Sequence, residues 1–215
     1  MNLIKIQTFL SNLSQNNSKP WMDENKKEYL AAKTEWLELI EIIIGYIYSI
    51  DPSIGFIESK STIFRINRDV RFSHDKSPYN THFSALIKRS GRKSQFAGYY
   101  LNLDKQGILS IGGGLMEPEP DTLKNIRVNL NKEGSTKFKK LFPLKSFKIW
   151  DHNKLKRIPN EFKDSLVPEL MLYKTFVQME SIELPSITDP VEFIECEMKK
   201  LQPFILYLNE LIVKL

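Results

Sequence analysis

Residues 96–113, FAGYYLNLDKQGILSIGG, decide the fold class of this chain. FAGYYLNLD and ILSIGG each have the length and the apolar and aromatic content that are typical of a strand. The KQG segment between them predicts a tight turn. Strands joined by so short a turn pair antiparallel, so this stretch predicts a hairpin within an antiparallel sheet.

Two further strands are predicted before this hairpin, because apolar and polar residues alternate along residues 63–72 and again along residues 81–89. The apolar positions are Phe64, Ile66, Val70 and Phe72 in the first segment and Phe83, Ala85 and Ile87 in the second. Arg68 falls among the apolar positions, so it requires an ion-pair partner or a bulge that turns it outward. Residues 60–117 are therefore expected to form a four-stranded antiparallel sheet with one face covered by helices.

Helical periodicity surrounds this sheet in the sequence. A short helix is predicted over residues 2–14 and a long one over about 21–49, with a middle helix from about Pro120 and a C-terminal helix from Asp189 to Leu215. Residues 173–182, YKTFVQMESI, alternate again and predict one more strand. We expect a single α+β domain over residues 1–215, in which an antiparallel central sheet is flanked by N-terminal, middle and C-terminal helices. Its parts are an N-terminal helical part (1–50), the sheet (60–117) and a helical and mixed C-terminal part (118–215).

The composition places the chain among ordinary globular proteins, with 41% hydrophobic and 27% charged residues among 215. A single cysteine excludes an intramolecular disulfide framework and is consistent with a reducing compartment. The longest uncharged apolar run, residues 42–50, is shorter than the roughly 20 residues that a membrane-spanning helix needs. The N-terminus has no signal-peptide pattern. We expect a soluble cytoplasmic protein with no membrane association.

Positive charge is concentrated in one segment. Residues 60–93 hold nine lysines and arginines and two aspartates, a net charge of +7, whereas the whole chain has a net charge of +5. The remainder therefore sums to −2. Such an asymmetry attracts anions, although a charged strand is more often solvated surface.

The basic segment and the glycines after the hairpin supply the candidate site. Arginine forms paired hydrogen bonds to phosphate or carboxylate, and consecutive glycines can present backbone N–H groups to an anion. Arg71 and Lys76 are expected to converge across the SHDKSP turn. The ligand-binding candidates are Arg65, Arg68, Asp69, Arg71, Asp75, Lys76, Tyr79, His82, Tyr99, Gly112, Gly113 and Gly114.

The competing interpretation is structural: Arg68, Asp69, Arg71 and Asp75 would form an internal ion-pair network that holds the loop after the first strand. The best guess for function is binding or processing of a small phosphorylated or carboxylated ligand. The alternatives are a nucleic-acid or acidic-partner binding module and an interaction protein without a catalytic site. In an enzyme, His82 or Asp75 would be the candidate general acid or base.

No cofactor is identified. The chain lacks both the GxxxxGK[ST] and GxGxxG nucleotide motifs. His82, His152 and Cys196 show no spacing that is typical of a zinc site, so no metal site is expected. The sequence does not indicate the oligomeric state.

Several of these segments resemble a known family. FRINRDVRFSHDKSPYNTHF, GYYLNLDKQGILSIGGGLMEPEPDTLKNIR, an early NN…W…Y, and LKRIP followed by YKTF are similar to the uncharacterised family called domain of unknown function 2461. The similarity runs from about Phe9 to Asn209, and it implies an α+β domain but no activity. Three places depart from the family pattern: Asn67 stands where tyrosine is usual, Asn80 where lysine is usual, and residues 160–162 where a glycine-containing turn is usual.

Overall fold

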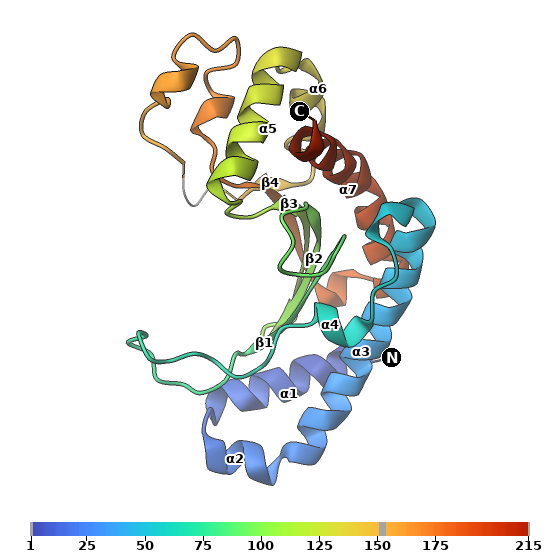
Figure 1. Cartoon of the computed structure of the whole chain (residues 1–215). Coiled ribbons are helices and arrows are strands. Elements are labelled where there is room, and N and C mark those ends of the chain that lie inside the picture. Colours follow the sequence, from blue (N-terminus) through green and yellow to red (C-terminus); the bar gives the residue numbers. More distant parts are fainter. Residues whose placement is uncertain (1, 151–153, 215) are drawn as a thin grey trace.

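The computed structural model covers the whole chain, and residues 2–150 and 154–214 are described here. Its centre is a five-stranded sheet in which every neighbouring pair is antiparallel. The strand order is β1-β2-β3-β5-β4. The strands are β1 (His82–Lys88), β2 (Gly98–Asp104), β3 (Ile108–Leu115), β4 (Lys148–Ile149) and β5 (Phe176–Glu183). The expected α+β domain with an antiparallel central sheet is confirmed (Figure 1).

The predicted hairpin is confirmed as β2 and β3. Asp104 closes its turn, because its Oδ1 accepts hydrogen bonds from the backbone N–H groups of Gln106 and Ile108 at 2.8 and 2.9 Å. Gly107 has a φ of +79° in this turn, a conformation that other residues rarely adopt. The short turn sets the register, which pairs Leu101 with Ile111.

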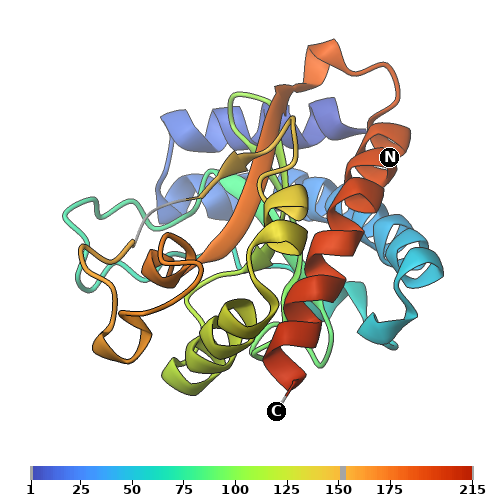
Figure 2. The ribbon, with the colours of Figure 1, turned by 90° about the horizontal axis from the view of Figure 1, so that it is seen from above.

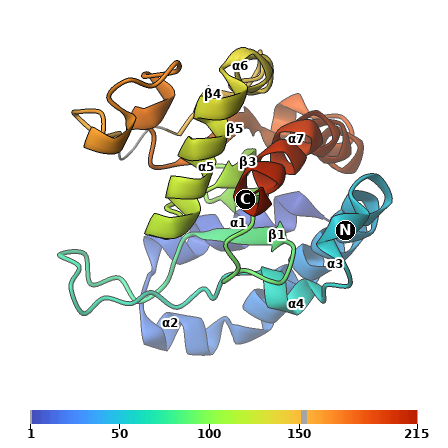
Figure 3. The same ribbon diagram turned by 45° about the horizontal axis from the view of Figure 1, so that its top comes forward.

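Helices cover one face of the sheet only. The helices are α1 (Leu3–Gln15), α2 (Lys19–Glu24), α3 (Lys26–Ile50), α4 (Ser59–Thr62), α5 (Pro120–Glu133), α6 (Thr136–Leu141) and α7 (Pro190–Val213). Contacts join α7 to β2 and β3, α1 to β2, and α3 to β1. In Figures 1 to 3 these helices lie together on one side of the sheet, which we call the closed face.

Strand periodicity assigns the apolar residues to the closed face. Alternate residues of the strands point to opposite faces, and those on the closed face are almost fully buried. They include Phe83, Ala85, Ile87, Tyr99, Leu101, Leu103, Leu109 and Ile111. Phe83 lies within an aromatic cluster, with ring centroids 6.4 Å from Phe9 and 6.1 Å from Trp36. Burying each large aliphatic or aromatic side chain contributes about 1.5–3 kcal/mol, so this face stabilises the domain.

The predicted strand over residues 63–72 is wrong. Two isolated bridges, Ile63 with Ala85 and Asn67 with Tyr79, are its only strand-like pairings in the described structure. Residues 64–80 instead form an irregular, projecting segment, which we call the arm (Figure 1). The alternation of apolar and polar residues along 63–72 does not correspond to a buried strand face, because the apolar residue Phe72 is 96% exposed. The backbone N–H groups of Arg71 and Ser77 donate hydrogen bonds to the side chains of Asp69 and Asp75, and these local bonds compete with strand pairing there.

The other elements differ from expectation in smaller ways. Three strands, not four, lie between residues 60 and 117. The predicted long helix is divided at Asn25 into α2 and α3, while the strand over residues 173–182 is confirmed as β5. No sequence pattern indicated β4, which has two residues. The C-terminal helix continues through Pro203.

Two carboxyl groups, one on β5 and one on α7, lie close enough to interact. Glu180 of β5 and Glu197 of α7 each have one buried carboxylate oxygen without a hydrogen-bond partner. Lys200 donates to the other oxygen of Glu197 at 2.5 Å. Burial and the neighbouring Glu197 raise the pKa of Glu180 above its ordinary value of 4.5. Ionising Glu180 in the folded protein is therefore unfavourable.

Replacing Glu180 with glutamine is expected to stabilise the protein at neutral pH. Because the pKa of Glu180 is raised in the folded state, its contribution favours folding below about pH 4.5 and is lost as the pH rises through the folded value. Glu180→Gln should raise Tm by about 2–4 °C at pH 7 and by less at pH 4. Thermal unfolding at both pH values measures this. Glu183→Gln, on the exposed end of β5, is the control, and an equal shift in both variants contradicts the assignment.

Candidate functional site

The open face of the sheet, opposite the helices, is organised in rows that cross the strands. One row is polar and consists of Ser84, Asn102, Ser110 and Ser181. The next row consists of Leu86, Tyr100, Gly112 and Met179. A third row consists of Lys88, Gly98, Gly114 and Val177. The first row has only small polar side chains, and two members of the third row, Gly98 and Gly114, have no side chain.

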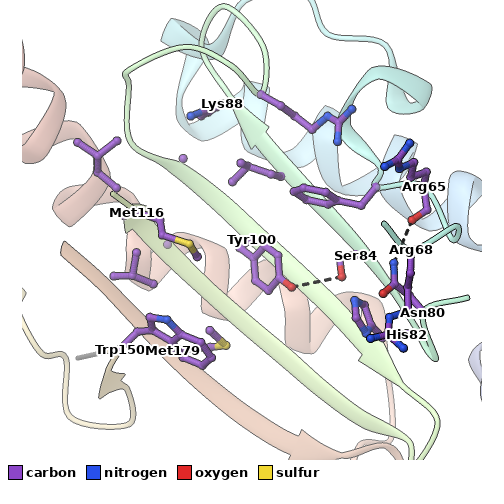
Figure 4. A pocket seen from close by; sticks show the side chains of 18 of the residues that line it. Arg65, Arg68, Asn80, His82, Ser84, Lys88, Tyr100, Met116, Trp150 and Met179 are labelled. Carbon is purple, nitrogen blue, oxygen red and sulfur yellow. Dashed lines mark hydrogen bonds between the residues drawn. The ribbon is translucent and has the colours of Figure 1, made fainter. Parts of the chain in front are cut away.

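A cleft of about 730 Å³ occupies this open face. Figure 4 shows Arg65, Arg68, Asn80 and His82 along one side of it and Met116, Met179 and Trp150 along the other. The arm supplies most of the first side. Trp150 reaches the cleft because its backbone N–H donates to the Val177 carbonyl at 2.9 Å, which extends the β4–β5 pairing by one residue. Segments far apart in the sequence thus enclose one space.

The cleft carries a marked excess of positive charge. Its charged lining residues are the cations Arg65, Arg68, Lys88 and Arg92 and the single carboxylate Asp69, a net of +3 with His82 neutral. None of the ion pairs among the described residues involves Arg65, Lys88 or Arg92. Asp69 is close enough to Arg65 for that guanidinium to help Arg71 lower the pKa of its carboxyl, whereas no described carboxylate pairs with Lys88 or Arg92.

Lys88 is the most buried of these cations, with 8% of its surface exposed. Its ammonium donates one hydrogen bond, to the Ser94 carbonyl at 2.6 Å. Burial lowers the pKa of Lys88, because desolvation disfavours the charged form. Gly98 permits this position: a Cβ at Gly98 would lie 2.3 Å from the Lys88 Cβ, so a side chain there would displace the lysine.

Arg92 and Arg65 flank the same side of the cleft. The Arg92 guanidinium lies 4.8 Å from the centroid of the Phe64 ring, and its Nε donates to the Ser61 carbonyl at 2.8 Å. These contacts hold the side chain while leaving most of its N–H groups available. The Arg65 backbone carbonyl accepts from Asn80 at 3.3 Å, which joins the two ends of the arm.

Two arginines of the arm are paired internally, as the structural interpretation expects. Arg68 donates to Asp75 at 2.5 Å and to the Ser77 carbonyl at 3.1 Å. Arg71 forms a two-pronged pair with Asp69, at 3.0 and 2.6 Å. Hydrogen bonds from Ser77 and Arg68 hold the pKa of Asp75 well below its usual range. Much of the charge of the arm is therefore neutralised within the arm.

The floor of the cleft holds a chain of hydrogen bonds. Tyr100 Oη donates to Ser84 Oγ at 3.2 Å (Figure 4), and Ser84 Oγ in turn donates to Asn102 Oδ1 at 2.8 Å. Burial raises the pKa of Tyr100, so its phenol keeps its proton at neutral pH. His82 lies at the end of the cleft nearest the arm. Partial desolvation lowers the pKa of His82, so the neutral ring predominates at pH 7.

Six of the predicted site residues line the cleft: Arg65, Arg68, Asp69, His82, Gly113 and Gly114. Arg71, Asp75, Lys76 and Tyr79 belong to the arm outside the lining, and Gly112 is buried and is not part of the lining. Tyr99 is fully buried on the closed face, where its hydroxyl donates to Asp51 at 3.1 Å. The side chain of its neighbour Tyr100 points to the open face, since consecutive strand residues point to opposite sides of the sheet.

Arg71 and Lys76 each have a partner within the arm, and neither lines the cleft. Arg71 binds Asp69, whereas the Lys76 ammonium donates to the Val70 carbonyl at 3.0 Å. The expectation assumed a regular strand before the turn, and the irregular arm gives the two side chains separate partners.

Sequence reasoning missed the lining residues Lys88, Arg92, Tyr100, Met116, Trp150 and Met179. Two features of the sequence could have indicated the first two of these residues. Lys88 and Arg92 belong to the +7 segment, and the strand period places Lys88 on the same face as His82. Nothing in the sequence brings Trp150 or Met179 to this face. Within residues 2–150 and 154–214, no three His, Cys, Asp or Glu side chains are grouped closely enough to hold a metal ion.

A comparison with protein families matches residues 5–207 to the conserved hypothetical protein family DUF2461. The chain belongs to this family. Neither the curated proteins nor the solved structures contain a match to this DUF2461 member. Asn67 and Asn80, two of its departures from the family pattern, both line the cleft. No helix in the described part of the protein is long and apolar enough to cross a membrane.

The two paired arginines of the arm are expected to differ in importance for its structure. The Arg68 side chain is 23% exposed and contacts Asp75, Ser73 and Ser77, whereas the Arg71 side chain is 77% exposed and contacts Asp69 and the exposed ring of Phe72. Arg68→Met should therefore increase amide hydrogen exchange across residues 66–79, and Arg71→Met should leave it close to wild type. Equal protection in the two variants contradicts this assignment.

Lys88 is expected to reduce stability in the ligand-free protein. Its pKa is lowered in the folded state, so the charged form favours the unfolded chain as the pH falls below the ordinary lysine value of 10.5. Lys88→Met retains the apolar stem and removes the charge, and it should raise Tm at pH 7. Lys93→Met removes the same charge from an exposed turn and is the control. It should leave Tm within about 1 °C of the wild-type value. A lower Tm in Lys88→Met would show that the ammonium is structural.

Proposed function

We propose that this protein binds a small organic anion in the cleft on the open face of its sheet. The observation that carries the proposal is that Lys88, a largely buried cation, lines this cleft beside the exposed Arg65 and Arg92, and that none of the three forms an ion pair with a described residue. Desolvating a cation without a partner is unfavourable, and a bound anion relieves this. Phosphate and carboxylate groups both suit these donors.

The cleft has the dimensions of a small-molecule site. Its volume of about 730 Å³ lies within the range of roughly 300–1,000 Å³ that is usual for ligand pockets. Leu86, Tyr100, Met116 and Met179 supply apolar surface beside the cations. This combination suits a ligand with an anionic group and an apolar body better than a bare inorganic anion.

His82 is the candidate for proton transfer if the bound anion is also processed. Its neutral ring can accept a proton at pH 7, and it lies within the cleft, at the end opposite Lys88. Asp75, the other candidate, is bound to Arg68 in the arm and outside the lining. We propose no reaction.

The proposal is tested by calorimetric titration with phenyl phosphate, benzoate, citrate and AMP at low salt. At least one of these is expected to bind wild type, and Lys88→Met should weaken its binding about tenfold or more, because a hydrogen bond to a charged group contributes about 1.5–3 kcal/mol. Lys93→Met, with the same charge change outside the cleft, should bind within twofold of wild type. Absence of binding by all four compounds, or equal losses in the two variants, overturns the proposal.

Nucleic-acid or acidic-partner binding is the second candidate, and it rests on the +7 segment. It ranks lower because Arg68 and Arg71 are paired within the arm, which leaves fewer free cations for a phosphate backbone. Titration of a 20-nucleotide single-stranded nucleic acid at two salt concentrations distinguishes nucleic-acid binding from binding of a small anion. Tight binding with a steep salt dependence would favour this candidate over a small anion. We also propose a cytoplasmic location, on the basis of the single cysteine.

A further inference from the structure

We infer that Lys88 binds its ligand covalently, because its amine forms an imine with an aldehyde or ketone carbonyl on the anion that the cleft holds. This inference rests on the proposed function and specifies the class of anion, a carboxylate or phosphate that also carries a carbonyl group. It is drawn from the surroundings of the Lys88 nitrogen and from the arginine that lines the cleft beside it.

The surroundings of Lys88 favour the uncharged amine. Lys88 is 8% exposed, and none of the ion pairs among the described residues involves it. Burial lowers its pKa, so a larger fraction of Lys88 is unprotonated near neutral pH than of an ordinary lysine. Only the unprotonated amine has the lone pair that attacks a carbonyl carbon, and lysines activated by desolvation act as nucleophiles of this kind.

The hydrogen bond of Lys88 holds its nitrogen in either protonation state. The partner is the backbone carbonyl of Ser94, at 2.6 Å. A carbonyl oxygen accepts from an amine N–H as well as from an ammonium N–H, whereas a carboxylate partner would favour the charged form. The Lys88 nitrogen is therefore held in place by a group that does not require it to be charged.

Lys88 and Arg92 are positioned by one short connection, and both line the cleft. Residues 89–97, which join β1 to β2, carry Arg92 and also the Ser94 carbonyl that holds the Lys88 nitrogen. In the described structure the Arg92 side chain makes one hydrogen bond, from Nε, so its two terminal NH2 groups remain for a ligand. An anionic group bound to Arg92 places the rest of the ligand in the cleft that Lys88 lines.

The proposed step is a condensation without net oxidation or reduction. The Lys88 nitrogen attacks the carbonyl carbon, a C–N bond forms, and a proton moves from the nitrogen to the carbonyl oxygen. The resulting hydroxyl group then leaves as water with the second nitrogen proton, and a C=N bond replaces the C=O bond. The amine and the carbonyl compound are thus converted into an imine and one water molecule.

The test traps the imine in the full-length protein. The anionic probes are 4-formylbenzoate and 4-formylphenyl phosphate, and methyl 4-formylbenzoate is the uncharged control. Sodium cyanoborohydride reduces each imine to a stable secondary amine, and peptide mapping by mass spectrometry measures the labelling of each lysine. At least one anionic probe should label Lys88 about fivefold or more faster than the exposed Lys93, because binding holds the carbonyl near the amine. Equal labelling of the two lysines by both anionic probes overturns the inference.

The pH dependence of labelling separates a reactive amine from a merely accessible one. It is measured with the methyl ester, which adds no charge near the amine. Because burial lowers the pKa of Lys88, its labelling should reach half of the maximal rate at a lower pH than the labelling of Lys93 in the same samples. Coincident profiles for the two lysines contradict the inference.

Two arginines of the same connection provide a matched pair of variants. Arg92 lies over the Phe64 ring and lines the cleft, whereas Arg89 lies over the Phe96 ring, at 4.7 Å, outside the lining. Arg92→Met should slow the labelling of Lys88 by the anionic probe about threefold or more and leave labelling by the ester close to wild type. Arg89→Met should leave both close to wild type. Equal effects of the two substitutions overturn the placement of the anionic group at Arg92.

Calorimetry separates failure of this inference from failure of the proposed function. Benzoate and phenyl phosphate have the anionic group and ring of the two probes but no aldehyde. Binding of either compound, without preferential labelling of Lys88, overturns imine formation and leaves anion binding standing. Absence of binding by all the anions of the calorimetric test, together with absence of preferential labelling, overturns both.

Discussion

The sheet is covered by helices on one face only, and the rest of the structure depends on this asymmetry. The closed face packs under α1, α3 and α7, and its side chains are almost fully excluded from solvent. That burial holds the strands together without help from the other side. The open face is therefore free to carry groups that pack poorly, including serines, three glycines and a buried lysine.

The arm converts this open face into an enclosed cleft. Its base is anchored by Asn17 of the N-terminal helical part, whose side chain both donates to the Tyr79 carbonyl and accepts from the Tyr79 N–H, at 2.9 and 3.1 Å. The buried ring of Tyr79 adds to this anchor. The exposed ion pair of Arg71 contributes little to stability, since such pairs are typically worth about 0–1 kcal/mol. The arm is therefore positioned at its base, while its internal pairs shape it locally.

The burial of Lys88 has opposite consequences for stability and for the proposed binding of an anion. A desolvated ammonium without a carboxylate partner disfavours folding, yet the same low-dielectric surroundings strengthen its attraction to a bound anion. Gly98 maintains this arrangement by leaving room for the lysine stem. Sites of this kind commonly sacrifice some stability for function.

The sequence by itself determined the α+β class, the β2–β3 hairpin, the strand at β5 and most helix positions, because each depends on local periodicity and turn chemistry. It also located the basic segment, although the alternation along residues 63–72 wrongly indicated a strand. Only the tertiary structure decided which cations are paired. Arg68 and Lys88 are both basic residues of the same segment, but Arg68 pairs with Asp75 whereas Lys88 donates only to the Ser94 carbonyl. The tertiary structure also decided that Trp150 and Met179 face Arg65 across one cleft, because strand order and helix packing, rather than sequence proximity, bring these side chains together.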